Sequence, residues 1–230
     1  MDFNKVKPIL LKSNWFSSLP DDVINQLVSL SKPKKLTPGQ LLHRKNDPAD
    51  GLYCVISGRI RVSNYTLEGK ELVLTWLQPG SWFGEISLFD GLPRSHDAHA
   101  EEASELLKIP STSFALLLAQ QPNLYPHFMR LLCQRLRATF SLIDETGSLS
   151  LKGQLCKRLL LLADGLEQQA PKTGELRLSI SQESLALLLH TSRQTINKLL
   201  QQLQRQKLLS VHYGRISILD KTKLAALSQI

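Results

Sequence analysis

The sequence predicts an α+β fold, in which an antiparallel β sandwich or roll is followed by helices and a short hairpin. Between Pro38 and Ile109, short runs rich in β-branched and aromatic residues are separated by glycines about every ten residues. After Pro110, apolar residues recur at spacings of three and four, which is typical of helices. The separating glycines are Gly39, Gly51, Gly58, Gly69, Gly80, Gly84 and Gly91.

Length and composition fit one large domain or two modest ones. The chain has 230 residues, of which 42% are hydrophobic and 21% are charged, and these fractions exclude intrinsic disorder and collagen-like repeats. The longest apolar run, 114–119, has six residues, so no membrane span is expected, and residues 1–5 do not begin a signal peptide. Three widely spaced cysteines, Cys54, Cys133 and Cys156, are those expected of a reduced, cytoplasmic protein.

The net charge of +8 is concentrated near the C-terminus. Residues 1–147 carry 16 basic and 15 acidic side chains, a net charge of +1, whereas residues 148–230 carry 12 and 5, a net charge of +7. This asymmetry indicates a C-terminal part that faces a polyanion. Charge alone leaves both nucleic acid and an anionic membrane surface open.

A long helix is predicted to begin near Pro122 or Pro126. Along it, Leu132, Leu136, Thr139 and Ile143 repeat at steps of four, three and four, a pattern that suits either a dimer seam or packing on the same domain. The pattern stops at Thr146-Gly147-Ser148, where the charge balance also changes. The expected parts are therefore 1–120, 121–147 and 148–230.

Two short helices are predicted in the last part, at 182–189 and 192–206, with only His190-Thr191 between them. A pair of helices with so tight a turn reads DNA when the second helix presents polar side chains. The alternative is an ordinary exposed helix with solvated charges. A hairpin follows around Tyr213-Gly214, and it would form a wing.

The polar face of the second helix offers groups for both bases and phosphates. Arg193 and Lys198 can donate to guanine, Gln194 can pair with adenine, and Ser192 and Thr195 suit phosphate oxygens. The remaining candidate DNA contacts are Ser181 and Gln182, at the start of the first helix, and His212 of the hairpin.

The most specific stretch of the sequence is 83–95. Gly84 allows close approach of a ligand to the backbone, and the short helix that follows directs amide hydrogens at an anion. Glu85 can accept a hydrogen bond from a ribose hydroxyl, Arg94 offers a planar fork to a phosphate diester, and Ser95 adds a hydroxyl. The alternative is a structural ion pair between Glu85 and Arg94.

The pair Gly84-Glu85, with Arg94-Ser95 nine residues after the glutamate, resembles the phosphate-binding cassette of cyclic-nucleotide-binding domains. With the motif at 192–196, the chain resembles the cAMP receptor protein/FNR family of bacterial transcription regulators over about residues 20 to 220. The resemblance implies a β-roll of the double-stranded β-helix (jelly-roll) type, a long dimerisation helix and a winged helix-turn-helix. It also implies a homodimer on a near-palindromic double-stranded operator, RNA polymerase as a further partner, and a cyclic nucleotide as effector, with cAMP the first candidate and cGMP open.

The resemblance also assigns roles on the long helix. Arg135 and Thr139 match positions that line the nucleotide, and the next position, a serine in cAMP-binding members, is Phe140 here. We hypothesise that this ring stacks on a purine. In the reading helix, Arg193 matches the family's guanine-reading arginine. Gln194 stands where many members carry glutamate, and Lys198 where they carry arginine, so the recognised DNA sequence is expected to differ from the best-known site of the family.

Other functions have little support in the sequence. No nucleophile-elbow, phosphate-loop or paired-histidine zinc motif is present, so no enzyme is expected. No cysteine precedes Cys54, which excludes the iron–sulfur branch of the family, and His96 and His99 would point to opposite faces of a strand, which argues against haem or metal. Two alternatives stay open: a family member that binds DNA without a nucleotide, and a cyclic-nucleotide module that regulates a protein partner.

Overall fold

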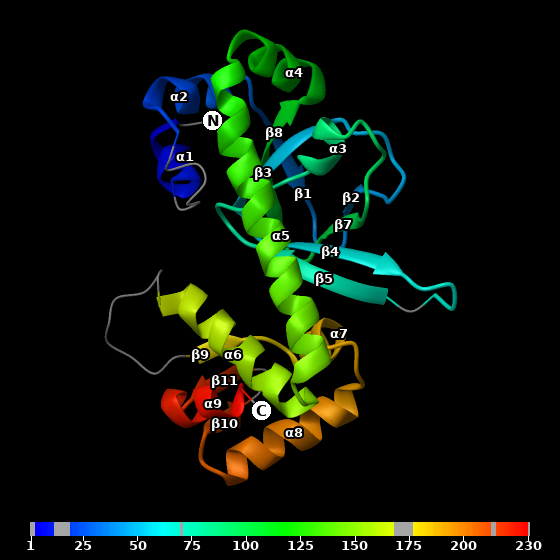
Figure 1. Ribbon diagram of the computed structural model, residues 1–230, viewed down its shortest axis with the longest axis vertical. Helices are drawn as coiled ribbons and strands as arrows, with labels where there is room; N and C mark the ends of the chain where they lie inside the picture. Colours follow the sequence, from blue (N-terminus) through cyan, green and yellow to red (C-terminus); the bar gives the residue numbers. More distant parts are fainter. Residues whose placement is uncertain (1–2, 12–18, 70, 168–176, 213–214, 230) are drawn as a thin grey trace. The chain divides into compact units, whose positions relative to one another are not determined.

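The structure is a computed structural model that describes residues 3–11, 19–69, 71–167, 177–212 and 215–229 (Figure 1). The chain divides into two compact units, Met1–Leu136 and Arg137–Ile230. None of the helices within the described ranges combines the length and the apolar character that a membrane span requires.

The first unit is built on two four-stranded antiparallel sheets (Figure 1). One sheet has the order β1-β8-β3-β6, and its strands are Lys32–Leu36, Ser104–Pro110, Gly51–Ser57 and Trp82–Phe83. The other has the order β2-β7-β4-β5, and its strands are Leu41–His43, Asp97–Ala100, Ile60–Tyr65 and Glu71–Leu77. The expected antiparallel β-roll is thus confirmed.

Strand β3 is buried on both faces, which explains its continuous apolar sequence. Leu52 and Cys54 belong to the apolar cluster shared with the N-terminal helices and α4, whereas Tyr53 and Val55 belong to the cluster shared with β4 and β7. Successive side chains of a strand point to opposite faces, so β3 separates two cores. Burial raises the pKa of the Cys54 thiol, which keeps this cysteine protonated.

Helices cover one side of the roll. They are α1 (Phe3–Leu10), α2 (Asp21–Ser29), α4 (Ser111–Gln120), the 3-10 turn η2 (Pro122–Leu124) and the start of α5 (Tyr125–Ser148). Helix α2 begins directly after Pro20 and carries two aspartates in its first turn, where they complement the helix dipole.

Helix α5 extends from the first unit into the second. It ends at Ser148, within the tripeptide expected to mark a domain boundary, whereas the compact units meet at Leu136, in the middle of the helix. Its last turns are held within the second unit by Glu145, a buried carboxylate 3.0 Å from Lys157 Nζ and 3.6 Å from Arg158 Nη2.

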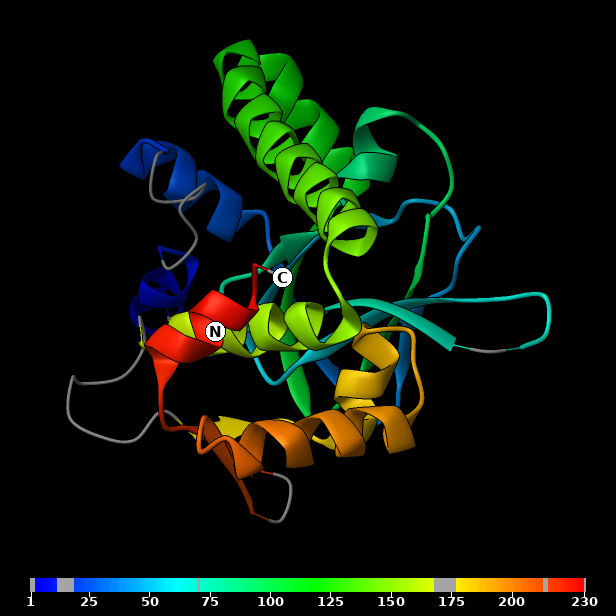
Figure 2. The same ribbon diagram turned by 60° about the horizontal axis from the view of Figure 1, so that its bottom comes forward.

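The second unit contains the predicted helix-turn-helix and a three-stranded sheet. Its elements are α6 (Leu151–Glu167), β9 (Arg177–Ser179), α7 (Gln182–Leu188), α8 (Arg193–Arg205), β10 (Leu209–His212), β11 (Arg215–Ile218) and α9 (Lys221–Leu227). The sheet order is β10-β11-β9, and α6 and α9 lie side by side (Figure 2). Strand β9 was not predicted. The expected hairpin pairs His212 with Arg215, and its turn, Tyr213-Gly214, lies outside the described residues.

Candidate functional site

The backbone between β6 and α3 (Ile86–Phe89) is shaped by a glycine. Gly84 has a φ of +91°, a conformation that side-chain-bearing residues rarely adopt. A Cβ atom at this position would lie 2.6 Å from Nη1 of Arg94 and 3.1 Å from the carbonyl oxygen of Gly51. The sequence therefore needs glycine here for its backbone conformation and for the space that the guanidinium occupies.

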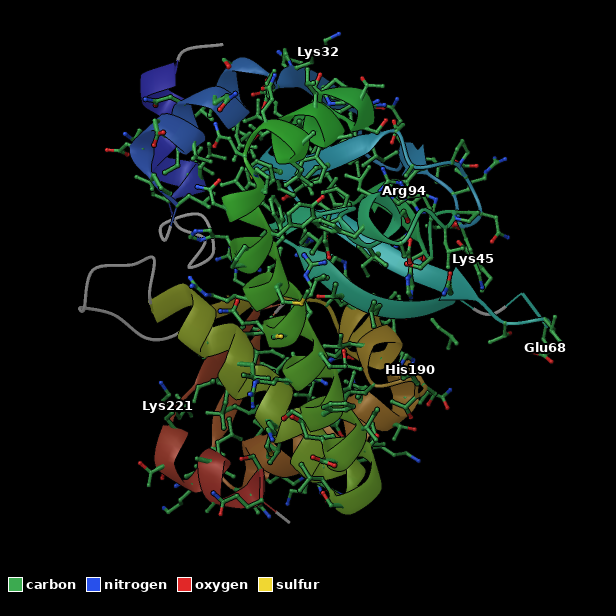
Figure 3. The ribbon with its side chains drawn as sticks, turned by 45° about the horizontal axis from the view of Figure 1, so that its top comes forward. Lys32, Lys45, Glu68, Arg94, His190 and Lys221 are labelled. Carbon is green, nitrogen blue, oxygen red and sulfur yellow. The ribbon has the colours of Figure 1, made fainter. Side chains whose placement is uncertain are left out.

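Arg94 lies inside the roll and is only 2% exposed, whereas Lys45 and Glu68 are on its outside (Figure 3). Its Nη1 donates to the carbonyl oxygen of Gly84 at 2.8 Å, and its Nη2 donates to that of Gly51 at 2.7 Å and to Oδ1 of Asp50 at 2.8 Å. Its Nε is buried and has no hydrogen-bond partner among the described residues. The Nε donor of a fixed cation is thus without a partner among the described residues.

Asp50 is the counter-ion of Arg94, and the sequence analysis missed it. Its Oδ2 also accepts from Lys108 Nζ at 2.6 Å and from the Tyr53 hydroxyl at 2.7 Å. Burial opposes ionisation of Asp50, but the hydrogen bonds from Lys108, Tyr53 and Arg94 outweigh it and hold the pKa of this carboxyl well below its ordinary range. No short motif links these positions, so no sequence signal could have found the cluster.

Glu85 is fully buried and pairs with the long helix. Its Oε1 accepts from Nη1 of Arg135, which also donates through Nη2 to the carbonyl oxygen of Trp82, while its Oε2 has no partner among the described residues. Burial raises the pKa of Glu85, although the charges of Arg135 and Arg94 act in the opposite direction. The alternative of a Glu85–Arg94 ion pair is wrong, because each residue pairs with a different partner.

The structure thus brings Gly84, Glu85, Arg94 and Arg135 together, but not all the expected residues. Ser95 is exposed, and its hydroxyl lies 2.9 Å from Nδ1 of His96. Thr139 and Phe140 are exposed residues in the part of α5 that belongs to the second unit. Their proposed nucleotide contacts stay predictions. The described residues form no group of three or more His, Cys, Asp or Glu side chains that could hold a metal ion.

One face of α5 is apolar and exposed. Met129, Leu136, Phe140 and Ile143 are each more than half exposed and follow one another at steps of seven, four and three. We call these four residues the α5 stripe. Two residues of the predicted seam, Leu136 and Ile143, belong to the stripe. The other two do not, because Leu132 is half-buried and Thr139 is polar. The exposed apolar face therefore lies closer to Phe140 than the predicted seam, because Phe128 and Leu131 pack into the core of the first unit.

The turn between α7 and α8 has the geometry of a helix-turn-helix. His190 lies in this turn (Figure 3) and takes a φ of +50°, a conformation that histidine tolerates better than most non-glycine residues. Ser192 caps α8, since its Oγ accepts from the backbone amide of Thr195 at 3.1 Å, and the two hydroxyls lie 2.8 Å apart. Ser181 caps α7 in the same way by accepting from the amide of Ser184.

The first turns of α8 present a polar face. Arg193, Gln194 and Lys198 are exposed, whereas Ile196 and Leu200 are buried in the core of the unit. Oε1 of Gln182 accepts from Nδ2 of Asn197 at 3.0 Å, and the DNA contact of Gln182 stays a prediction. His212 is exposed at the end of β10.

Two family models match the chain, one in each unit. Residues 33–121 match the cyclic nucleotide-binding domain, and residues 153–227 match the Crp-like helix-turn-helix domain. Together with the fold, these matches define a DNA-binding transcription regulator with a cyclic-nucleotide-binding domain, and not an enzyme.

Two known transcription regulators are similar in sequence to this chain. The "cAMP-activated global transcriptional regulator CRP" of Pasteurella multocida is 30% identical over 181 residues, which cover 78% of this chain and 84% of that protein. The "CRP-like cAMP-activated global transcriptional regulator" of Mycobacterium tuberculosis is 27% identical over 219 residues, 94% of this chain and 97% of that one. The chain belongs to the CRP/FNR family of transcription regulators.

Solved structures show the same fold. A CRP/FNR family transcriptional regulator from Thermus thermophilus is 25% identical, with a TM-score of 0.70, and the match covers 86% of this chain and 99% of that one. FixK2 of Bradyrhizobium japonicum, at 16% identity, has a TM-score of 0.75 over 86% of this chain and 96% of its own. The second likeness concerns the fold alone.

Proposed function

We propose that this regulator is a homodimer gated by a cyclic nucleotide, with cAMP as the first candidate, bound at Gly84, Glu85, Arg94 and Arg135. The observation that carries the proposal is a pair of buried atoms without partners among the described residues, Nε of Arg94 and Oε2 of Glu85. A cyclic nucleotide supplies what each lacks: a phosphodiester accepts from the guanidinium, and a ribose hydroxyl donates to the carboxylate. Two relatives carry "cAMP-activated" in their names, which supports the same ligand.

The α5 stripe supports the homodimer. Exposed apolar side chains at heptad-like spacing on a 24-residue helix are the pattern by which two helices pack as a coiled coil. A second copy of the chain presents the same stripe, so a two-fold interface is self-complementary. In such a dimer, Thr139 would approach the nucleotide of its own subunit and Phe140 that of the partner.

In the proposed complex, α8 enters the major groove of each half of a near-palindromic operator. Arg193 and Lys198 donate to guanine, and Gln194 pairs with adenine. The hydrogen bond between the hydroxyls of Ser192 and Thr195 uses one of their two O–H donors, so the other hydroxyl and the backbone amides at the start of α8 provide the phosphate contacts. Ser181, at the start of α7, and His212, of the wing, lie next to the DNA backbone. RNA polymerase is a further partner, and the protein acts in the cytoplasm, where its DNA lies.

Calorimetric titration with cAMP, cGMP and 5′-AMP tests the effector. We expect Arg94→Gln to lose binding, because it removes the cation that faces the phosphodiester. The matched control is Arg44→Gln, which makes the same change on an exposed side chain and should leave the affinity unchanged. If the wild type binds no cyclic nucleotide, the effector assignment fails, and the regulator binds DNA without one.

Operator binding at several salt concentrations tests the DNA contacts. Arg193→Ala should cost about 1–3 kcal/mol and relax discrimination at one base pair. Arg205→Ala, in the last turn of the same helix, is the matched control and should change affinity little for any sequence. The logarithm of the operator affinity should fall with the logarithm of the salt concentration, with a slope of about −0.9 per neutralised phosphate. An operator affinity that does not fall as salt is added would favour a module that regulates a protein partner.

A further inference from the structure

A histidine lies inside the β-roll, beside the cassette. His43 ends strand β2 and pairs in register with Ala98, a fully buried residue of β7. Its ring centroid lies 6.3 Å from that of Tyr53 and 6.4 Å from that of Phe83. Phe83 immediately precedes Gly84, and Tyr53 lies under the guanidinium of Arg94, 5.7 Å from its Cζ. His43 therefore faces the same interior as the cassette.

Both ring nitrogens of His43 are buried, and neither makes a hydrogen bond of ordinary geometry within the described residues, although the backbone carbonyl of His96 acts on the ring as a weak acceptor. Buried polar atoms of folded proteins are almost always paired, because an unpaired donor or acceptor loses its hydration without compensation. Two such atoms on one side chain are unusual for an ordinary core histidine. They resemble Nε of Arg94 and Oε2 of Glu85, the two partnerless atoms of the cassette.

The charge state of His43 follows from its surroundings. Burial and the positive charge of Arg94 lower its pKa to about 4, against the smaller opposing effects of Asp50, Asp47 and the backbone carbonyl of His96. The imidazole is therefore neutral at pH 7 and offers one donor and one acceptor. Besides these groups, the aromatic rings of Tyr53 and Phe83 face it, and burial raises the pKa of the Tyr53 hydroxyl, which stays protonated.

We propose that His43 is a specificity-determining residue of the nucleotide site, where its uncharged imidazole makes a hydrogen bond to the bound cyclic nucleotide. The inference rests on the proposed function and adds a contact outside the cassette. Other members of the buried cluster that holds Tyr53 and Phe83, such as Val55, Ile60 and Leu106, cannot make this contact because their side chains are aliphatic.

The contact links affinity to pH. Arg94 disfavours protonation of His43 in the free protein, and a bound phosphodiester offsets that positive charge. The pKa of His43 is then higher in the complex than in the free protein, so binding takes up protons as the pH falls. We expect the His43 contribution by itself to raise the affinity about two- to tenfold between pH 8 and pH 5.5. Glu85 contributes its own pH dependence, which a His43 variant retains.

The test is calorimetric titration of cAMP and cGMP at pH 5.5, 6.5 and 8 with the wild type, His43→Leu and His43→Gln. His43→Leu should lose about tenfold in affinity at pH 6.5 and should lose the pH dependence that distinguishes the wild type. His43→Gln keeps a donor and an acceptor but does not titrate. It should therefore retain most of the nucleotide affinity and lose the dependence of that affinity on pH which comes from His43. The matched control is His99→Leu, which replaces a half-buried histidine of β7 and should change neither.

Two results would overturn the proposal: His43→Leu with wild-type affinity and slope, or a His43 pKa that is the same with and without nucleotide in an NMR titration of the wild type. The NMR measurement needs no variant to fold. Arg94→Gln separates this inference from the proposed function. If the wild type binds and Arg94→Gln does not, the effector assignment holds whatever His43 does, whereas a wild type that binds no cyclic nucleotide removes both.

Discussion

Phe89 and Phe128 pack against each other with ring centroids 5.3 Å apart and ring planes inclined by 57°. Phe89 ends α3, the short helix that follows Glu85, and Phe128 lies in the first turn of α5. Phe114 of α4 contacts both rings, at 5.7 and 5.1 Å. With the Glu85–Arg135 ion pair, this gives the cassette two connections to the long helix, one apolar and one charged.

Loss of the apolar connection should give a variant that binds the nucleotide normally but whose operator binding responds less to it. Phe89→Ala removes the contact with Phe128 and leaves Arg94 and Glu85 in place, so nucleotide affinity should stay within a few fold. The coupling between nucleotide and operator, typically about 1–3 kcal/mol, should fall, because only the charged connection through Glu85 and Arg135 remains. Operator titrations with and without cAMP measure it, and Phe89→Leu should keep part of the coupling. Full coupling in Phe89→Ala would show that the signal does not pass through this ring.

Gly84→Ala should damage the cassette, whereas the same substitution at Gly69 should not. The new Cβ adds backbone strain of about 1–3 kcal/mol and collides with the guanidinium of Arg94, so nucleotide affinity should fall at least tenfold. Gly69→Ala imposes similar strain at a φ of +77°, but nothing lies within 4 Å of the added atom. It should therefore lose stability only. Equal affinity in both variants, measured by calorimetry, would contradict the role of the close approach.

Glu85 should make stability depend on pH. Its pKa is raised in the folded protein, so between the unfolded and folded values the folded state holds more protons, and stability falls as the pH rises through this window. Glu85→Gln lacks this component. The free energy of unfolding of the variant minus that of the wild type should therefore grow between pH 5 and pH 7 in urea titrations. A difference that is constant or shrinks with pH would mean that the carboxyl is ionised as easily as in water.

Leu136→Glu should separate subunits without unfolding them. The side chain is 52% exposed in the single chain, so a charge is tolerated there, but in a dimer it would be buried against its own copy. We expect the dimer to weaken by about 2 kcal/mol or more, measured by sedimentation equilibrium. Gln134→Glu, which places the same charge on an exposed position of α5 outside the stripe, is the control. An unchanged dimer in Leu136→Glu would place the interface elsewhere.

Contacts close in sequence could be predicted, and contacts set by strand register could not. Gly84, Glu85 and Arg94 lie within a short stretch, and the Ser192 cap depends on a residue three positions away, so both were accessible to sequence reasoning. Asp50, by contrast, meets Arg94 and Lys108 across separations of 44 and 58 residues. The Lys108 contact follows from the register of β3 and β8, in which Tyr53 pairs with Lys108. His43 escaped notice for the same reason.

The hydrogen bonds of Arg94 to Gly84, Gly51 and Asp50 have a consequence for the energetics of recognition. A free arginine side chain loses rotamer freedom when a ligand immobilises it, at a cost of roughly 0.5–1.5 kcal/mol. Here three anchors have already fixed the guanidinium before any ligand arrives. The ordering therefore belongs to the folding of the roll and not to the association step, so the cation acts as a rigid template that selects ligands by shape as much as by charge.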